Sequence, residues 1–214
     1  APAPPELIER AVAALPHVGF VNVFGQTETL GAVTALGPDE HRAGGSGSVG
    51  MPLPGVEIRI VDPETGNHGD EGELWVRAPH TVEEGWVRTG DLVRRDPDGR
   101  LHATGRLSDG INRGGEKISP FEIEQAIRGH AAVADVAVVG VRDRELGERI
   151  AAASVVSASV DADEIRAWCA TRLAPYKIPE RIRFVDALPR TELGKVSRPA
   201  VRALLEEGPR PGKS

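Results

Sequence analysis

Short runs in which apolar and polar residues alternate dominate the first half of the chain. Val56, Ile58 and Ile60 are separated by charged residues, which is the period-two pattern of a half-buried strand. Comparable runs are separated by turn formers such as the Asp-Pro-Asp-Gly sequence at 96–99. A helix precedes them over residues 4–15, with proline in its first turn. We expect strands over residues 20–24, 56–60, 73–77, 86–88, 92–95 and 100–104, which makes this half β-rich.

The second half mixes helical and strand patterns. Ser119, Pro120 and Glu122 form a capping box with proline at the first helical position, and Asp161 with Glu164 repeats the cap signal. These signals predict helices over residues 120–129, 162–174 and 199–206, with strands over 133–141, 149–156 and 182–185.

The change of pattern places a domain boundary at residues 106–109. We therefore predict a mixed α+β fold, with a β-rich part over residues 1–106 and a small α+β domain over residues 107–214. A glycine-rich stretch at 44–48 lacks the lysine and the following helix of a phosphate-binding loop, so we interpret it as a flexible linker.

Composition narrows the classes of protein that the chain can belong to. The 214 residues are 40% hydrophobic and carry a formal net charge of −6 at pH 7, which favours a globular fold and argues against nucleic-acid binding. No apolar run approaches the roughly 20 residues of a membrane-spanning helix.

The single cysteine, Cys169, excludes an internal disulfide and fits a reducing cytoplasm. We expect Cys169 on the face of a helix that packs into the core. The histidines are scattered without the spacing of metal ligands.

Four separated segments carry candidate chemistry: residues 23–28, 87–92, 105–118 and 189–196. In the first of them, Phe24 offers a flat face on which adenine can stack, and Thr27 offers a hydroxyl to a phosphate oxygen. Glu28 offers a hard oxygen ligand for Mg²⁺. The alternative for this segment is a strand-end turn with solvated polar residues.

The other segments supply charged groups. Asp91 can accept two hydrogen bonds from the vicinal hydroxyls of a ribose, and Arg106 can reach the ribose or a phosphate through charge-assisted hydrogen bonds. The alternative for these two is a surface ion pair. Lys195 follows Gly194 in a loop without apolar periodicity, where a mobile tip would let its long side chain reach a site formed by another domain. The alternative is a solvated loop lysine.

Taken in this order, the four segments resemble the adenylate-forming superfamily, which includes acyl-CoA synthetases, aryl-CoA ligases, luciferases and the adenylation domains of peptide synthetases. The resemblance covers nearly the whole chain. It implies ATP, Mg²⁺ and CoA as cofactor and co-substrates, with Lys195, Thr27 and Glu28 as catalytic residues and Glu28 as the magnesium ligand. It implies that the nucleotide-binding residues are Phe24, Gly25, Gln26, Thr27, Asp91, Arg106, Lys117 and Lys195.

The resemblance also implies a conformational change. Ser108 stands where family members usually carry Asp or Lys as a hinge, and a serine cannot form the corresponding salt bridge. Rotation at this hinge would bring Gly114 and Gly115 to the site, where they would line a tunnel for CoA, with Lys117 close to the phosphate. The alternative for the two glycines is a simple turn before the following helix.

These observations lead us to expect the C-terminal portion of an acyl-CoA synthetase: the last β-rich subdomain of the large adenylation domain, followed by the mobile small domain. The Ser/Thr/Gly-rich triphosphate loop that the family carries upstream has no counterpart in residues 1–22, so we expect an N-terminal remainder and an inactive fragment. The motifs look more like those of fatty-acyl and aryl-acid ligases, and no carrier module follows Ser214, which favours CoA as the acceptor. We expect a cytoplasmic protein that acts on a carboxylic acid, without nucleic acid or a membrane span. The alternatives are a non-catalytic module that binds an adenylate or a partner protein, or one half of a split ligase.

Overall fold

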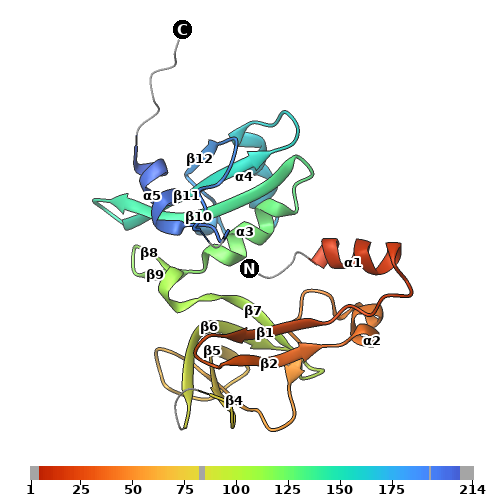
Figure 1. The fold of residues 1–214 in the computed structure, drawn as a ribbon. Helices are drawn as coiled ribbons and strands as arrows, with labels where there is room; N and C mark the ends of the chain where they lie inside the picture. The colour runs from red at the N-terminus through yellow and green to blue at the C-terminus, as the bar shows by residue number, and fades with distance from the viewer. Residues whose placement is uncertain (1–4, 82–84, 193, 208–214) are drawn as a thin grey trace. The chain divides into compact units, whose positions relative to one another are not determined.

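The computed structural model describes residues 5–81, 85–192 and 194–207. It divides into two compact units, Ala1–Leu107 and Ser108–Ser214 (Figure 1). Each unit contains both helices and strands, so the predicted mixed α+β fold is confirmed.

The first unit is built on two antiparallel sheets, with strand orders β1-β2-β3 and β4-β5-β6-β7. Alternate side chains of the second sheet turn inward, and Leu74, Val76 and Leu101 pack there with Val33 and Val49 in one apolar cluster. The strands are β1 (Asn22–Gln26), β2 (Gly31–Leu36), β3 (Met51–Pro52), β4 (Glu57–Val61), β5 (Glu71–Arg77), β6 (Val87–Arg95) and β7 (Leu101–Arg106).

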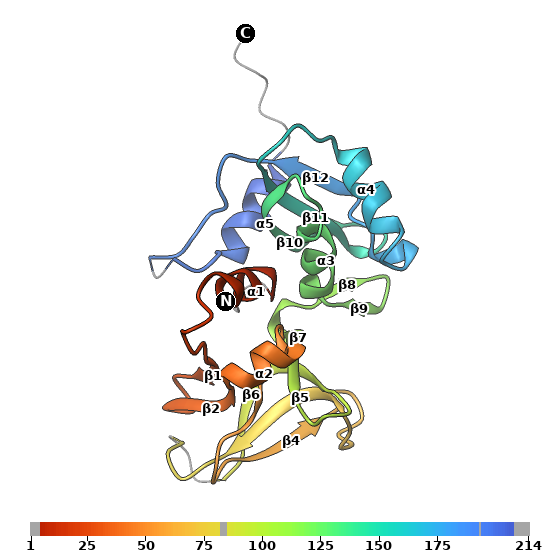
Figure 2. The ribbon, with the colours of Figure 1, turned by 90° about the vertical axis from the view of Figure 1, so that its right-hand side faces the viewer.

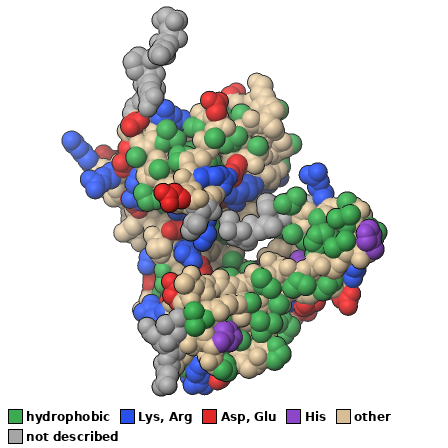
Figure 3. All heavy atoms as spheres, viewed as in Figure 1, with side chains coloured by type: hydrophobic (Ala, Val, Ile, Leu, Met, Phe, Trp, Pro, Cys, Tyr) green, Lys and Arg blue, Asp and Glu red, His purple; other side chains and the backbone are tan. Residues whose placement is uncertain are grey.

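The first unit begins with helix α1 (Pro5–Ala14), which confirms the first predicted helix. Apolar side chains gather over α1 in Figure 3, and Leu7 on this helix is 53% exposed. None of the described side chains of α1 is buried. The apolar residues of this helix therefore contribute little to the core of the first unit.

Two strands of this unit differ from their predictions. The strand expected over 20–24 begins and ends two residues later and pairs with β2, which the sequence pattern did not reveal. The strands expected over 86–88 and 92–95 are one strand, β6, because residues 89–91 bulge without leaving the sheet. Polar residues interrupt the apolar alternation there, and alternation is the main local signal of a strand.

The flexible linker predicted at residues 44–48 is wrong, because this stretch is packed. Two helical segments, α2 (Pro38–Glu40) and η1 (His41–Gly45), lead into it. A Cβ atom on Gly45 would lie 2.8 Å from the carbonyl oxygen of Glu40, so a larger residue does not fit without a shift of the backbone.

Ser48 fixes the end of the same stretch to the second sheet. Its side chain is fully buried, and its hydroxyl donates to the carbonyl oxygen of Leu101 at 2.8 Å. The same hydroxyl accepts the backbone N–H of Gly50 at 2.9 Å. The stretch is thus held by hydrogen bonds that a linker would not make.

Replacing Ser48 with alanine tests this packing. We expect Ser48→Ala to lower the free energy of unfolding by about 1–3 kcal/mol, because a buried acceptor and a buried donor lose their partner. Ser46→Ala is the matched control, since the buried Ser46 hydroxyl has no hydrogen-bond partner among the described residues and its loss should cost little. Urea unfolding followed by circular dichroism measures both. Equal stability of Ser48→Ala and the unmodified chain would restore the linker interpretation.

The second unit is built on one five-stranded sheet, in which β10, β11, β8 and β9 are neighbours and β12 pairs in parallel with β11. The strands are β8 (Ile111–Arg113), β9 (Glu116–Ile118), β10 (Val133–Asp143), β11 (Gly147–Val156) and β12 (Arg181–Phe184). The helical segments are η2 (Leu107–Asp109), α3 (Pro120–Arg128), α4 (Ala162–Ala170), η3 (Pro175–Lys177) and α5 (Arg198–Glu206).

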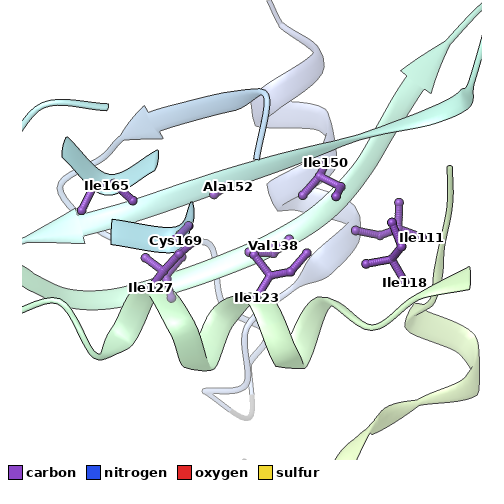
Figure 4. Packing of buried hydrophobic residues seen from close by; sticks show 10 residues of the cluster. Ile111, Ile118, Ile123, Ile127, Val138, Ile150, Ala152, Ile165 and Cys169 are labelled. Carbon is purple, nitrogen blue, oxygen red and sulfur yellow. The ribbon is translucent and has the colours of Figure 1, made fainter. Parts of the chain in front are cut away.

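Helices cover both faces of this sheet (Figure 2). Successive residues of β10 point to opposite faces, so Val138 packs under α3 and α4 while Val139 packs under α5. Figure 4 shows the first of these clusters, where Ile123 of α3 and Ile165 of α4 meet the sheet. Cys169 is fully buried in it, which confirms its predicted place in the core.

The three helices predicted for the second half are present as α3, α4 and α5, although α4 ends at Ala170 rather than at residue 174. The capping box predicted at Ser119 is wrong, because Ser119 precedes α3 without a side-chain cap hydrogen bond. At the start of α4, the Asp161 carboxylate accepts the backbone N–H of Glu164 at 2.8 Å, as its cap signal predicts. The hairpin of β8 and β9 was not predicted, because three-residue strands are too short to show a period. In the part of the chain that the structure describes, no helix is long and apolar enough to cross a membrane.

Candidate functional site

Three of the predicted segments of the first unit meet at the carboxylate of Asp91. Arg106 lies opposite Asp91 in the β6–β7 ladder, and its Nε donates to Asp91 Oδ1 at 2.7 Å. The side-chain amide of Gln26 donates to Asp91 Oδ2 and, at 2.9 Å, to the carbonyl oxygen of Thr89. The side chain of Asp91 is 10% exposed and that of Arg106 is 55% exposed. The structure therefore brings together these three predicted residues from β1, β6 and β7.

The Asp91 segment is a bulge in β6. Glu73 pairs with Leu92 and Trp75 pairs with Arg88, so three residues of β6 lie opposite one residue of β5. A bulge leaves backbone groups without ladder partners, and side chains satisfy them here. These partners are Thr89 and Glu73, both buried polar residues that sequence reasoning missed.

The hydroxyl of Thr89 closes one side of the bulge. It donates to the carbonyl oxygen of Leu74 at 2.7 Å and accepts the backbone N–H of Asp91 at 3.1 Å. Thr89 thereby fixes the backbone on which the Asp91 side chain stands. The sequence signal for Thr89 is its place directly before Gly90 and Asp91. The local pattern does not show that its side chain is buried.

The β1–β2 ladder has a second bulge, opposite the step from Phe24 to Gly25, where β2 has one extra residue. A Cβ atom on Gly25 would lie 2.0 Å from the carbonyl oxygen of Gly31, which only glycine avoids. The fully buried hydroxyl of Thr29 accepts the backbone N–H of Gln26 at 2.9 Å and donates to Gly31 at 2.9 Å. Thr29 was also missed, and it keeps the Gln26 amide in register with Asp91.

Thr27 and Glu28 lie exposed in this turn. No described residue forms an ion pair with the Glu28 carboxylate, so it is accessible to a cation. Groups of three or more His, Cys, Asp or Glu side chains that could hold a metal ion are absent from the described residues. A single carboxylate still fits Mg²⁺, because this ion keeps several waters and shares its coordination with substrate phosphates.

Phe24 is half-buried and packs against the apolar cluster of the first unit. The core therefore covers part of its ring, and only the remaining surface is open for the stacking that the sequence suggests.

In the second unit, Lys195 lies exposed next to residues that are joined by backbone hydrogen bonds. Arg190 and Val196 form a β-bridge, the N–H of Thr191 donates to the Lys195 carbonyl oxygen at 2.7 Å, and the N–H of Gly194 donates back to Thr191 at 2.8 Å. Gly194 has a φ of +76°, a backbone conformation that glycine adopts without strain. No described carboxylate pairs with the Lys195 ammonium, which leaves it available for a ligand.

The predicted hinge Ser108 is exposed, and the neighbouring Asp109 forms a salt bridge with Arg198. Arg198, the first residue of α5, donates from Nε to Asp109 at 2.7 Å and from Nη1 to Glu124 at 2.8 Å. The buried Glu124 also accepts the backbone N–H of Val138 at 2.9 Å. A charged network thus connects the hinge segment to the helix that begins three residues after Lys195.

Gly114 and Gly115 form the two-residue turn of the β8–β9 hairpin, with φ of +61° and +93°. Such a turn needs positive φ at both central positions, which glycine adopts without strain. The N–H of Gly114 donates to the carbonyl oxygen of Leu146 at 2.8 Å, and Arg113 binds Glu180 at 2.8 Å. The turn is therefore anchored to the rest of the unit, and Lys117 lies exposed on its second strand.

Asp143 orders the β10–β11 turn to which this hairpin is bonded. Its carboxylate accepts the N–H groups of Glu145 and Leu146 at 3.0 Å and the Nε of Arg149 at 2.5 Å. The Arg149 hydrogen bond, followed by these backbone donors, lowers the pKa of Asp143 to about 2.

This shift predicts a pH dependence of stability. Because folding lowers the pKa of Asp143 from near 4, its contribution is complete above that value and disappears as the pH falls towards 2. The unmodified chain should be more stable than Asp143→Asn at pH 6, and this difference should shrink between pH 4 and pH 2 in urea unfolding series. Glu145→Gln on the same turn is the control. The Glu145 carboxylate is 85% exposed and lies as far as 3.9 Å from the Arg149 guanidinium, so its replacement should change stability little at any pH. A difference that does not vary with pH would contradict the assigned shift.

Comparison with known proteins places this geometry in context. Residues 1–86 match the family model described as AMP-binding enzyme, and residues 122–195 match that of the AMP-binding enzyme C-terminal domain. The feruloyl-CoA synthase of an Amycolatopsis species is 36% identical over 94% of this chain and 44% of its own length.

Two solved structures are similar over nearly the whole chain. The amide bond synthetase McbA of Marinactinospora thermotolerans has a TM-score of 0.85 at 34% identity, covering 95% of this chain and 44% of that one. The o-succinylbenzoate CoA synthetase of Bacillus subtilis, in complex with ATP and a magnesium ion, has a TM-score of 0.79 at 32% identity, covering 96% and 45%. This chain thus spans less than half the length of each of these proteins.

Proposed function

Because the chain belongs to the AMP-binding enzymes, the adenylate-forming ligases, we propose that it is the C-terminal portion of an acyl-CoA synthetase. Residues 1–106 would end the large adenylation domain, and residues 107–214 would form the small mobile domain. The observation that carries the proposal is the junction of Gln26 and Arg106 on the buried carboxylate of Asp91. The turn that follows Gln26 carries the exposed Glu28, which has no ion-pair partner among the described residues.

The proposed reaction has two steps. In the first, a carboxylate oxygen attacks the α-phosphorus of ATP, giving an acyl-adenylate and pyrophosphate. In the second, the thiol of CoA attacks the acyl carbon, forming the thioester and releasing AMP. Adenylation is needed because the oxygen of a free carboxylate is a poor leaving group, whereas AMP leaves readily.

Asp91 and Arg106 would bind the ribose. A carboxylate offers about four acceptor positions, and the donors from Gln26 and Arg106 leave capacity for a hydroxyl. The charge-assisted hydrogen bonds from Arg106 fix the orientation of the Asp91 carboxylate. Phe24 would contact the adenine with the part of its ring that the core leaves open.

Thr27 and Glu28 would bind the phosphates on the turn that Thr29 and Gly25 hold. Glu28 would hold Mg²⁺, an ion that neutralises phosphate charge and orients the oxygens. Support comes from the absence of a competing cation at Glu28 among the described residues and from the magnesium and ATP named in the complex of the Bacillus subtilis relative.

Lys195 would contact both the attacking carboxylate and the α-phosphate, stabilising the charge that develops between them. Rotation at Ser108 would then exchange this lysine for the Gly114–Gly115 turn, along which the CoA arm would pass, with Lys117 near the phosphate. The exposure of the lysine and of the glycine turn supports both assignments. One of the similar structures is an amide bond synthetase. An amine is therefore the alternative acyl acceptor that should be tested against the thiol of CoA.

The two half-reactions test the role of Lys195 in the complete enzyme. We expect Lys195→Ala to slow acyl-adenylate formation by about 100-fold or more, because a charge that stabilises the transition state is lost. Thioester formation from supplied acyl-adenylate should be nearly unchanged. Pyrophosphate exchange and thioester assays measure the two steps. Arg42→Ala, which removes an exposed cation bound to Asp39, is the control and should affect neither. Equal loss in both steps would contradict the assignment.

Titration of the 214-residue chain tests its status as a portion of the enzyme. We expect weak or no binding of a non-hydrolysable acyl-adenylate in isothermal titration, since the triphosphate loop has no counterpart in residues 1–22. Addition of the preceding part of the protein as a separate chain should restore binding if the site is only divided. Tight binding by the 214 residues alone would instead favour a non-catalytic adenylate-binding module.

A further inference from the structure

The geometry points to Glu73 as a positioning residue that sets the orientation of Asp91 towards the ribose hydroxyls of the nucleotide. This inference rests on the ribose-binding role proposed above for Asp91. Glu73 itself would not touch the nucleotide; it would act through the backbone of the bulge in β6.

Glu73 is a buried carboxylate that receives only donors. It is 2% exposed, and its Oε2 accepts the indole N–H of Trp75 at 2.8 Å and the Nη2 of Arg88 at 2.8 Å. Its Oε1 accepts the backbone N–H of Gly90 at 3.2 Å. Burial of a charge is costly unless it is paired and hydrogen-bonded, and these contacts provide both conditions.

The contact with Gly90 is the one that reaches the site. Gly90 is the middle residue of the bulge and has φ +69°, so its N–H points away from the regular ladder. Glu73 captures that N–H on one side, while the hydroxyl of Thr89 captures the N–H of Asp91 on the other. Two neighbouring amides of the bulge are thus fixed by side chains, and Asp91 begins from this fixed backbone.

A glutamine cannot reproduce this arrangement. Its amide would place an NH₂ group where one of the two carboxylate oxygens stands, although both positions face donors. Either Gly90 or the Trp75–Arg88 pair would lose its acceptor. The bulge would relax, and Asp91 would lose its alignment with the ribose diol.

Nucleotide discrimination distinguishes positioning from mere structural support. In the complete enzyme, we expect Glu73→Gln to reduce kcat/KM for ATP by roughly tenfold, mainly through KM, as for a lost hydrogen bond to a charged group. The reduction of kcat/KM for 2′-deoxy-ATP should be much smaller, because this substrate already lacks one of the two hydroxyls. The preference for ATP over 2′-deoxy-ATP should therefore narrow. If Glu73 has a purely structural role, kcat/KM for ATP and for 2′-deoxy-ATP should fall by the same factor. This result would overturn the inference.

Glu57→Gln is the matched control. Glu57 lies on the neighbouring strand and binds Arg77 across the β4–β5 ladder at 3.0 Å, as Glu73 binds Arg88 across the next ladder. It is exposed and does not contact the bulge. Trp75→Phe removes one donor to Glu73 while leaving the Gly90 contact. Both variants should keep the preference of the unmodified enzyme; narrowing in either would contradict the assignment to Gly90.

Asp91→Asn separates this inference from the proposed function. If the unmodified enzyme does not prefer ATP, or if Asp91→Asn leaves the preference intact, the ribose role of Asp91 fails. If Asp91→Asn removes the preference while Glu73→Gln keeps it, only the inference about Glu73 fails. Should Glu73→Gln not fold, Glu73→Asp retains the charge but withdraws it from Gly90, and it must narrow the preference in the same way.

Discussion

The carboxylate of Asp91 is the point on which the first unit depends, because hydrogen bonds from β1 and β7 converge there on β6. Its partners, Gln26 and Arg106, are 65 and 15 residues away along the chain. The β1–β2, β5–β6 and β6–β7 ladders each contain a bulge close to the meeting point. Bulges reorient side chains at the expense of backbone pairing, so buried side chains must replace the lost hydrogen bonds. Glu73, Thr89 and Thr29 do this.

In the second unit, both faces of the sheet are buried. Helices α3 and α4 cover one face and α5 covers the other, and apolar side chains fill the space between the sheet and the helices. The candidate chemical groups therefore lie on loops and hairpin turns. Their backbones are fixed by contacts such as those of Asp143 and Arg198, while Lys195 and Gly114–Gly115 stay exposed. A rigid base with exposed groups is the arrangement expected of residues that contact a ligand.

The predicted hinge Ser108 lies next to a residue that forms a salt bridge. A serine cannot form the ion pair that the family usually carries at this position, yet Asp109 beside it binds Arg198. Arg198 in turn binds the buried Glu124. The segment that contains the predicted hinge is thus bonded to α5, the helix that follows the Lys195 loop.

The sequence by itself determined the kinds of element, the fold class and the chemical groups of the motifs, because periodicity, caps and glycine turns are local properties. It also carried the resemblance that named Asp91, Arg106 and Lys195, whose roles remain predictions. Only the tertiary structure decided that residues 89–91 stay inside one strand, that residues 44–48 are packed rather than a linker, and that Glu73 and Thr29 are buried. These depend on hydrogen bonds between residues far apart in the chain, such as Ser48 with Leu101. A local pattern shows to which side of a sheet a side chain points. Its hydrogen-bond partner on that side is known only once the pairing of the strands is known.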